Sequence, residues 1–324
     1  MNTILVMGGA GYIGSHTVRH LADNGYNVVV ADNLVYGHRE SVDKRADFML
    51  ADLLDSASLN KVFTTHKIDA VIHFAAFADV GESVNNPEKY YYNNVVGTLN
   101  LLQAMLANDV KRIVFSSSCA TYGKPQYVPM DEKHPQAPIS PYGRTKLMVE
   151  QIFEDYNHAY GLQYIALRYF NAAGCSADGL IGESRVPETH LIPLVLKAIN
   201  GELPDLKVFG TDYDTPDGTC IRDYIHVEDL ATAHRLAVEK LNDYSGCINL
   251  GTGIGTSVKE IITASEKVTG KKCPVKYVGR REGDPAKLFA NNNKAKEILG
   301  WEPKYTDIVD IVKTAWKWEQ DRKY

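Results

Sequence analysis

The sequence predicts an α/β protein built on a doubly wound parallel sheet, with a second, smaller α/β domain added to it. Three observations predict this architecture. Short apolar segments alternate with amphipathic ones, a glycine-rich turn follows the first apolar segment, and 324 residues exceed what one core layer comfortably covers. We place the larger domain at 1–171 and the smaller one at 172–324, and we expect segments near 221–251 to return to the larger domain.

The composition is that of a folded, soluble chain. Hydrophobic residues make up 44% and charged residues 23%, and no apolar run approaches the ~20 residues that span a bilayer. A formal charge of -5 argues against nucleic-acid binding, which needs a basic surface. The residues before the first strand lack the features of a secretory signal. We therefore expect a cytoplasmic protein with no nucleic-acid or membrane partner.

The cysteines indicate neither a disulfide framework nor a zinc site. They are odd in number, scattered, and never spaced as Cys-x-x-Cys. We expect reduced thiols and no metal ion at Cys119, Cys175, Cys220, Cys247 and Cys273.

The first unit of the sheet is "ILVMGGAGYIGSH", a buried strand, a glycine turn and the start of a helix. Gly8, Gly11 and Gly14 are spaced three apart, which brings the helix amino terminus and its free N–H groups to a pyrophosphate. The second strand, "NVVVADN", ends in Asp32. An acid at this distance accepts hydrogen bonds from a ribose and repels a 2'-phosphate. The pattern predicts a Rossmann unit that binds NAD rather than NADP.

The following units continue the alternation. "DFMLADLLD" brings Asp52 and Leu53 to the end of a third strand, and "DAVIHFAAFADVGES" is a fourth strand with a small-residue loop. "RIVFSSS" and "QYIALRYFN" are two further strands. The segment after Pro87 is helical, and its periodicity predicts one buried stripe, formed by Val95, Leu99, Leu102 and Leu106.

A Tyr-x-x-x-Lys pair follows the serine-rich strand. Tyr142 and Lys146 are one helical turn apart and share a face. A free tyrosine, with a pKa of roughly 10, is a poor base at neutral pH unless a cation stabilises its phenolate. Lys146 supplies that cation, and Ser118 at the strand end can hold a substrate hydroxyl beside Tyr142. These three residues predict a proton-transfer site.

From Cys175 the pattern changes to loops and short elements. "LIPLVLKAIN" predicts a helix, and a turn-forming run precedes a strand and helix in "CIRDYIHVEDLATAH". We interpret Asp223, His226 and Asp229 in this stretch as structural.

Taken together, these motifs resemble those of the extended short-chain dehydrogenase/reductase family, and within it the UDP-glucose 4-epimerases. The resemblance covers nearly the whole chain and rests on "GGAGYIGSHT", "ADN", "VIHFAA", "VGES", "YYNNVVGTLNLL", "FSSSCATYG", "SPYGRTKLMVEQI", "LRYFNAAG", "DGTCIRDYIHVEDLA", "NLGTG" and "RREGDPAKLFA". It implies interconversion of UDP-glucose and UDP-galactose at the sugar C4, by transient oxidation with tightly bound NAD through a 4-keto intermediate. N-acetylated UDP-hexosamines are implied as weak substrates, and a homodimer through residues 88–108 and 142–160.

The resemblance also assigns roles by position. Tyr142 is implied as the base, Lys146 as its cationic partner and Ser118 as the hydroxyl relay. The implied NAD contacts are Gly8, Gly11, Tyr12, Ile13, Gly14, Asp32, Asn33, Asp52, Leu53, Phe74, Ala75, Ala76, Asn93, Ser116, Tyr142, Lys146 and Tyr169. The implied UDP-sugar contacts are Ser118, Tyr142, Asn171, His190, Leu191, Phe209, Arg222, Arg281, Asp284 and Leu288.

Three positions depart from patterns common in the family, and two other functions remain open. Met7 replaces a threonine, Ala78 replaces a lysine of some relatives, and Leu288 occupies the gate of the sugar pocket. A nucleotide-sugar 4,6-dehydratase shares the fold, but its Asp-Glu pair is absent because Cys119 and Ala120 follow the serine strand. A non-catalytic NAD-sensing protein is the other alternative, since fold does not fix function.

Overall fold

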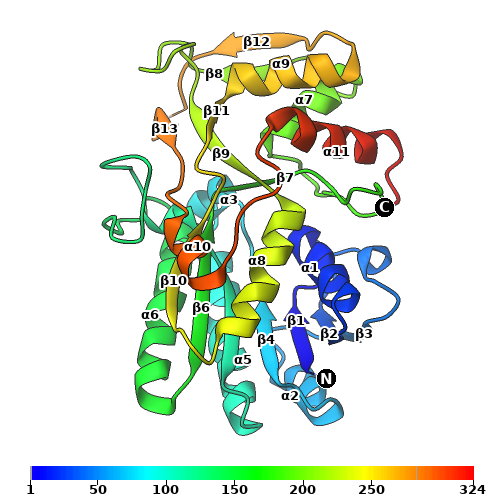
Figure 1. The fold of residues 1–324 in the computed structure, drawn as a ribbon, viewed down its shortest axis with the longest axis vertical. Helices are drawn as coiled ribbons and strands as arrows, with labels where there is room; N and C mark the ends of the chain where they lie inside the picture. The colour runs from blue at the N-terminus through cyan, green and yellow to red at the C-terminus, as the bar shows by residue number, and fades with distance from the viewer. Residues whose placement is uncertain (1, 282) are drawn as a thin grey trace.

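The computed structural model describes residues 2–281 and 283–324, arranged as a larger lower body and a smaller upper one (Figure 1). Among these residues the larger body contains a seven-stranded, all-parallel sheet. This confirms the predicted doubly wound α/β fold. In spatial order the strands are β10 (Gly246–Leu250), β6 (Gln163–Tyr169), β5 (Arg112–Ser118), β4 (Ala70–His73), β1 (Thr3–Met7), β2 (Asn27–Asp32) and β3 (Asp47–Leu50).

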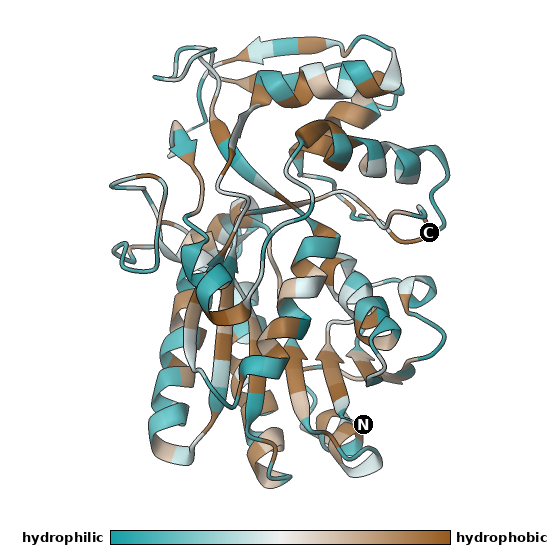
Figure 2. Ribbon diagram, viewed as in Figure 1, coloured by the Kyte–Doolittle hydropathy of each residue, from teal (hydrophilic) through white to brown (hydrophobic). Residues whose placement is uncertain are grey.

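Alternating side chains along the strands divide the core into two layers. Ile4 and Val6 of β1 pack on one face of the sheet, and Leu5 and Met7 pack on the other. The strands are apolar along most of their length (Figure 2), as expected for a sheet buried on both faces. The first face is covered by α1 (Tyr12–Asp23), α8 (Val227–Lys240) and α10 (Asn293–Leu299), and the second by α2 (Ser56–Thr65), α5 (Gly97–Ala107) and α6 (Pro141–Tyr160).

Of the predicted stripe of Val95, Leu99, Leu102 and Leu106, Leu102 is fully buried, Val95 and Leu106 are half-buried, and the placement of Leu99 is wrong. The helical region after α3 (Val80–Asn85) begins as α4 (Pro87–Tyr90), widens into a π-helix at Tyr91–Val96 and then continues as α5. The wider turn changes the rotational phase, so that Thr98, Leu101, Leu102 and Met105 are buried. Leu99 is 36% exposed instead.

The smaller body gathers short strands and three helices. One sheet contains β7 (Asn171–Ala173), β9 (Ile221–His226), β11 (Gly255–Ser257) and β13 (Lys287–Leu288). A second pairs β8 (Leu206–Phe209) with β12 (Val275–Val278). The helices are α7 (Leu191–Ile199), α9 (Val258–Thr269) and α11 (Ile308–Gln320), which pack around a separate apolar core. Short 3₁₀ turns occur at Arg39–Ser41 and Cys119–Thr121.

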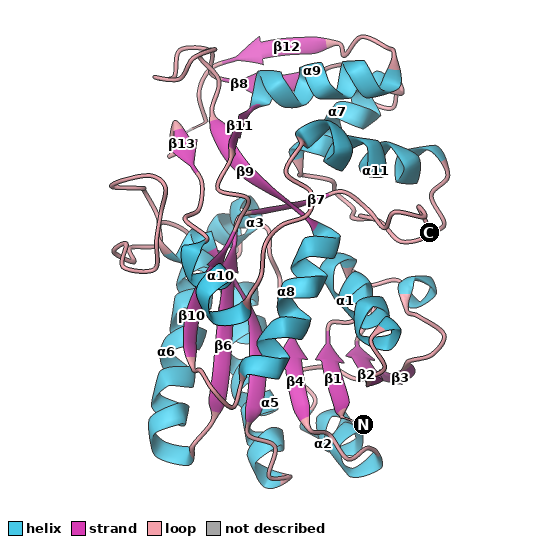
Figure 3. Ribbon diagram, viewed as in Figure 1, coloured by secondary structure: helices cyan, strands magenta, loops and turns pink. Residues whose placement is uncertain are grey.

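The chain passes repeatedly between the two bodies (Figure 3). It leaves the lower body from β6 into β7, returns from β9 into α8, and leaves again from β10 into β11. It then returns from β13 to α10 and leaves a last time to α11. Neither body is therefore one continuous segment of sequence.

Buried carboxylates hold these crossings together. Asp223 of β9 accepts N–H groups of Thr252 at 2.8 Å and of Ala290 at 3.1 Å. Asp229 of α8 accepts the N–H groups of Lys304 and Tyr305, both at 3.0 Å. The structural role predicted for both aspartates is confirmed.

Within the described parts of the chain, none of the helices combines the length and apolar character needed to cross a lipid bilayer.

Candidate active site

The serine-rich strand β5 and helix α6 place the proton-transfer residues together. The side chain of Ser140 accepts the N–H of Gly143 at 3.2 Å, and Pro141 opens the helix, so α6 begins immediately before Tyr142. Tyr142 and Lys146 are both buried, at 9% and 2% exposure. Ser118 is the last residue of β5; its hydroxyl accepts the N–H of Ala120 at 3.1 Å and is near enough to Tyr142 to lower the pKa of the phenol.

Burial opposes charge on both members of the Tyr-Lys pair. It raises the pKa of Tyr142 to about 12, against the opposing effect of the Ser118 hydrogen bond. It lowers the pKa of Lys146 to about 7. The ammonium donates to the Ser116 carbonyl at 2.7 Å and lies 5.8 Å from the centre of the Tyr142 ring. Transfer of the tyrosine proton to a neutral Lys146 changes no net charge and gives a phenolate beside a cation.

A buried ion pair supports this site from behind, and sequence reasoning missed it. Arg168 of β6 binds Glu150 of α6 through two nitrogens, at 2.9 and 2.7 Å. Glu150 also accepts the Ser117 hydroxyl at 2.5 Å, and Arg168 donates to the Tyr122 hydroxyl at 2.9 Å. The network joins β5, β6 and α6. An isolated Glu or Arg gives no sequence signal for such a contact.

The glycine turn forms the floor of a cleft at the carboxyl end of β1. Gly8 has φ +81°, and a Cβ there would lie 2.6 Å from the Ala75 nitrogen, so no other residue fits. A Cβ on Gly14 would lie 2.2 Å from the Gly8 carbonyl oxygen, so glycine lets α1 approach the turn. Gly11 precedes α1, whose first turn has no side-chain cap. The free N–H groups in the first turn of α1 and the close approach of the backbone at the glycines fit the pyrophosphate of a dinucleotide.

Asp32 lies at the edge of this cleft in a defined orientation. Its carboxylate accepts the N–H groups of Ala10 at 2.9 Å and Leu34 at 2.8 Å. Burial raises the pKa of Asp32, and these N–H groups oppose the shift. Arg39, the cation nearest in sequence, lies over the Phe48 ring at 4.5 Å. Asp32 thus faces the cleft without an arginine partner among the described contacts.

The structure brings most of the other predicted cofactor residues to the same place. The cleft is lined by Gly8, Gly11, Asp32, Asn33, Leu53, Phe74, Ala75, Ala76 and Asn93, together with Tyr36 and Phe77, which the sequence argument did not name. Asp52 accepts the Asn33 amide at 2.8 Å. Ser116 and Tyr169 hydrogen-bond each other at the ends of β5 and β6. Tyr12 instead directs its hydroxyl to the Gly174 carbonyl at 2.5 Å, and Ile13 packs against the core.

The upper body contributes basic and aromatic side chains from β8, β9 and the segment before β13. Arg222 of β9 forms an ion pair with Asp284. The Arg281 guanidinium lies 4.4 Å from the centre of the Phe209 ring. Leu288 pairs with Arg222 in the register of β13 and β9, and packs with a small buried cluster formed by Tyr122, Met130, Phe170 and Ala290.

The remaining predicted substrate residues lie at the start of β7 and at the start of α7. Asn171 donates to the Asp223 carbonyl at 2.9 Å, and Leu191 is the first residue of α7. His190 Nδ1 lies 2.5 Å from a carboxylate oxygen of Glu183. Burial opposes charge on His190, but Glu183 outweighs it and raises the pKa of the imidazole.

The same loop contains a cluster of possible metal ligands. Glu183, Glu188 and His190 place ligand atoms within 4.8 Å of one another. Arg185 Nη1 lies 3.1 Å from His190 Nε2. The Arg185 guanidinium brings a positive charge to the two carboxylates, so the cluster has a cation of its own.

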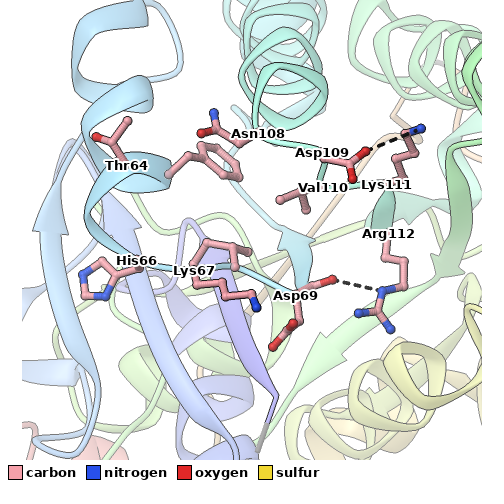
Figure 4. Close-up of a pocket in the computed structure, with 11 residues that line it drawn as sticks. Thr64, His66, Lys67, Asp69, Asn108, Asp109, Val110, Lys111 and Arg112 are labelled. Carbon is pink, nitrogen blue, oxygen red and sulfur yellow. Dashed lines mark hydrogen bonds and ion pairs between the residues drawn. The ribbon is translucent and has the colours of Figure 1, made fainter.

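A wider hollow lies at the opposite end of the sheet, beside the amino ends of β4 and β5 (Figure 4). Arg112 Nε donates to the Asp69 carbonyl at 3.0 Å, and Lys111 lies 3.6 Å from the Asp109 carboxylate. Lys67 and Lys111 lie just beyond the carboxyl ends of α2 and α5, where cations favour the helix dipole. The helix ends therefore account for the two lysines of this hollow.

Comparison with known proteins gives a consistent result. A sequence model described as the NAD dependent epimerase/dehydratase family matches residues 4–251. The chain is 54% identical over 318 residues to a UDP-glucose 4-epimerase of Rhizobium leguminosarum bv. trifolii, covering 98% of this chain and 97% of that relative. A crystal structure of UDP-glucose 4-epimerase from Brucella ovis in complex with NAD superposes with a TM-score of 0.95, at 52% identity over 98% of both chains. The structure from Bifidobacterium longum in complex with NAD+ and UDP gives a TM-score of 0.94, at 41% identity over 99% of both chains.

Proposed function

Because the chain belongs to the NAD dependent epimerase/dehydratase family, we propose that it interconverts UDP-glucose and UDP-galactose by inverting the sugar at C4. The observation that carries this function is the buried group of Ser118, Tyr142 and Lys146 at the end of β5 and the start of α6. It supplies a base, a cation and a hydroxyl. The cofactor cleft is built on neighbouring strands of the same sheet.

The chain's own residues move the proton. Tyr142 takes it from the sugar 4'-hydroxyl, and Ser118 holds that hydroxyl within reach. Lys146 stabilises the phenolate, since the two charges form together in a buried site. NAD, when bound, supplies reversible hydride acceptance at C4. After the 4-keto sugar rotates within the site, the hydride would return to the other face of C4, and Tyr142 gives the proton back to the C4 oxygen, which completes the inversion.

The UDP moiety is assigned to the upper body. Arg222 and Arg281 suit the diphosphate because a planar guanidinium binds oxygens in pairs. Asp284 is assigned to the uridine ribose, and a guanidinium with five donors can keep this carboxylate while it binds phosphate. Phe209 provides an apolar surface for uracil. The remaining contacts with the ligand are assigned to Asn171, His190, Leu191 and Leu288.

The cofactor and the reaction can be tested in one preparation. Purified protein given UDP-galactose and no cofactor is expected to form UDP-glucose, and acid extraction is expected to release NAD. The Asp32 carboxylate would face a 2'-phosphate as a like charge with little water, which disfavours NADP by several kcal/mol. Absence of turnover would refute the reaction, and extraction of mostly NADP would refute the role of Asp32.

The residues after the serine strand argue against dehydration. A 4,6-dehydratase needs an acid and a base to remove water, and Cys119 and Ala120 stand at that place. Burial raises the pKa of the Cys119 thiol to about 12, so it cannot exchange protons readily near pH 7.

We infer a homodimer in the cytoplasm. Four apolar side chains on adjoining elements of the lower body are exposed, namely Val84, Tyr92, Leu99 and Met148. Clustered exposed apolar side chains favour a protein interface. The five cysteines are free thiols, which suits a reducing compartment.

Leu288 is expected to control the substrate range. Tyrosine at this place would fill the space that an acetamido group needs, whereas cysteine would leave it free. An apolar contact of this kind is worth only ~1–3 kcal/mol of discrimination. We expect strong preference for the plain hexoses with weak turnover of the N-acetylated pair. Leu288→Cys should raise the N-acetyl rate, and Leu288→Tyr should abolish it while plain hexoses still react.

The measurement is the ratio of kcat/KM for N-acetylated and plain substrates in the three proteins. Turnover of UDP-galactose by each variant is the internal control for folding. A ratio that stays the same in all three would mean that Leu288 contributes only to packing in the cluster with Tyr122 and Phe170.

A further inference from the structure

Three side chains from separate segments meet beside the cofactor cleft. Tyr36 follows β2, Phe77 follows β4, and Lys89 lies in α4. The rings of Tyr36 and Phe77 meet edge to face with centroids 5.6 Å apart. The Lys89 ammonium lies 4.1 Å from the centroid of Phe77 and 3.2 Å from the hydroxyl of Tyr36. Two aromatic rings and one cation therefore join three parts of the chain.

This bridge spans the cleft. Tyr36 and Phe77 both line it, and Tyr36 remains 48% exposed to solvent. In the sheet, β1 lies between β2 and β4. A contact between the loops that follow β2 and β4 therefore crosses the carboxyl end of β1, where the glycine turn begins at Gly8. The bridge therefore crosses the end of the sheet to which the pyrophosphate is assigned.

The backbone on both sides of Tyr36 is fixed. Leu34 has φ +59°, a conformation that side chains other than glycine adopt rarely, and its N–H is held by Asp32 at 2.8 Å. A Cβ on Gly37 would lie 2.8 Å from that of Ala10, so the loop is pressed against the glycine turn. The loop that carries the Tyr36 ring is thus held in place by its own backbone contacts.

The lysine is fixed as well. Glu82 accepts the Lys89 ammonium at 2.6 Å and the Tyr90 hydroxyl at 2.8 Å. Tyr90 is fully buried. An ion pair with Glu82 alone would need neither ring, but the ammonium lies against Phe77 and Tyr36 in addition. The position of Lys89 is therefore explained by the bridge.

We propose that Tyr36, Phe77 and Lys89 form a latch that slows the release of NAD between catalytic cycles. This proposal rests on the proposed function, in which the same cofactor serves every turnover. The latch residues position the loops and take no part in the proton transfer at Tyr142. Breaking the latch should therefore speed the release of the cofactor.

The test measures NAD release from holoenzyme. Protein purified with its cofactor is diluted into an excess of alcohol dehydrogenase and ethanol, which converts released NAD to NADH, followed by absorbance. Tyr36→Phe and Lys89→Met should each speed release about tenfold, as expected for loss of one hydrogen bond to a charged group. The double variant should release NAD more slowly than the product of the two effects predicts, because both changes remove the same contact.

Tyr277→Phe is the matched control. Tyr277 is 55% exposed on β12 of the upper body and lies outside the latch, so the release rate of this variant should equal that of the native protein. Native release rates in both single variants, or the same acceleration in the Tyr277 variant, would overturn the latch. If instead no NAD accompanies the native protein, the proposed function fails and the latch fails with it.

Discussion

Replacement of Tyr142 by phenylalanine should lower epimerase turnover by at least the ~100-fold typical of losing a general base. The substitution removes one oxygen from a side chain that is 9% exposed and leaves the ring in place. The phenolic oxygen is the only group on that ring able to take a proton from the sugar.

Folding and cofactor content separate this effect from a structural one. The phenylalanine variant should melt near the native temperature and carry nearly the native amount of NAD. The rate should be measured with UDP-galactose at saturation, so that kcat alone is compared. Near-native turnover with full cofactor content would show that another group is the base.

Replacement of Lys146 by methionine should produce a comparable loss at pH 7 and change the shape of the pH profile. In the native protein the pair becomes competent when Lys146 loses a proton, at a pKa of about 7, and the tyrosine proton can then move to the amine. The rate should therefore fall below pH 7 and stay level above it. Without the amine, the tyrosine must lose its proton to solvent, at a pKa of about 12. The variant's rate should rise about tenfold per pH unit up to pH 10.

The informative measurement is the slope of the Lys146→Met variant's rate against pH. A loss of rate caused by disturbed packing would be the same at every pH. Methionine has similar length and is compatible with a side chain that is only 2% exposed. A variant profile parallel to the native one would contradict the role given to the lysine charge. The double variant Tyr142→Phe/Lys146→Met should not regain turnover as the pH rises, because it has no phenol to deprotonate.

The fold could be predicted because its signals are local. Asp32 ends a run of valines, Gly8 requires a positive φ, and Ser140 precedes proline at a helix start, so each is readable within a few residues. The prediction that Leu99 is buried was wrong because it assumed a constant helical period of 3.6 residues. A single π-helical turn shifts the phase of everything after it, and no residue type in Tyr91–Val96 marks that turn.

The parts of the candidate site that lie within one sequence motif could be predicted. Contacts between residues that are far apart in the sequence could not. The pair of Arg222 and Asp284 joins residues 62 positions apart. Arg222 is assigned to the diphosphate and Asp284 to the uridine ribose. The ion pair between them depends on the tertiary fold and leaves no signal in the sequence. Glu183 was missed because an acid before a loop is common. Only folding brings it to His190.

The repeated passage of the chain between its two bodies limits how such a protein can diversify. A body encoded by one continuous segment can be exchanged as a unit by recombination, but here a cut at any one crossing separates strands that belong together. Asp223 and Asp229 add to this, since each binds backbone from a segment on the far side of a crossing. New binding properties must therefore arise by replacement of single side chains, within an upper body inherited together with its sheet.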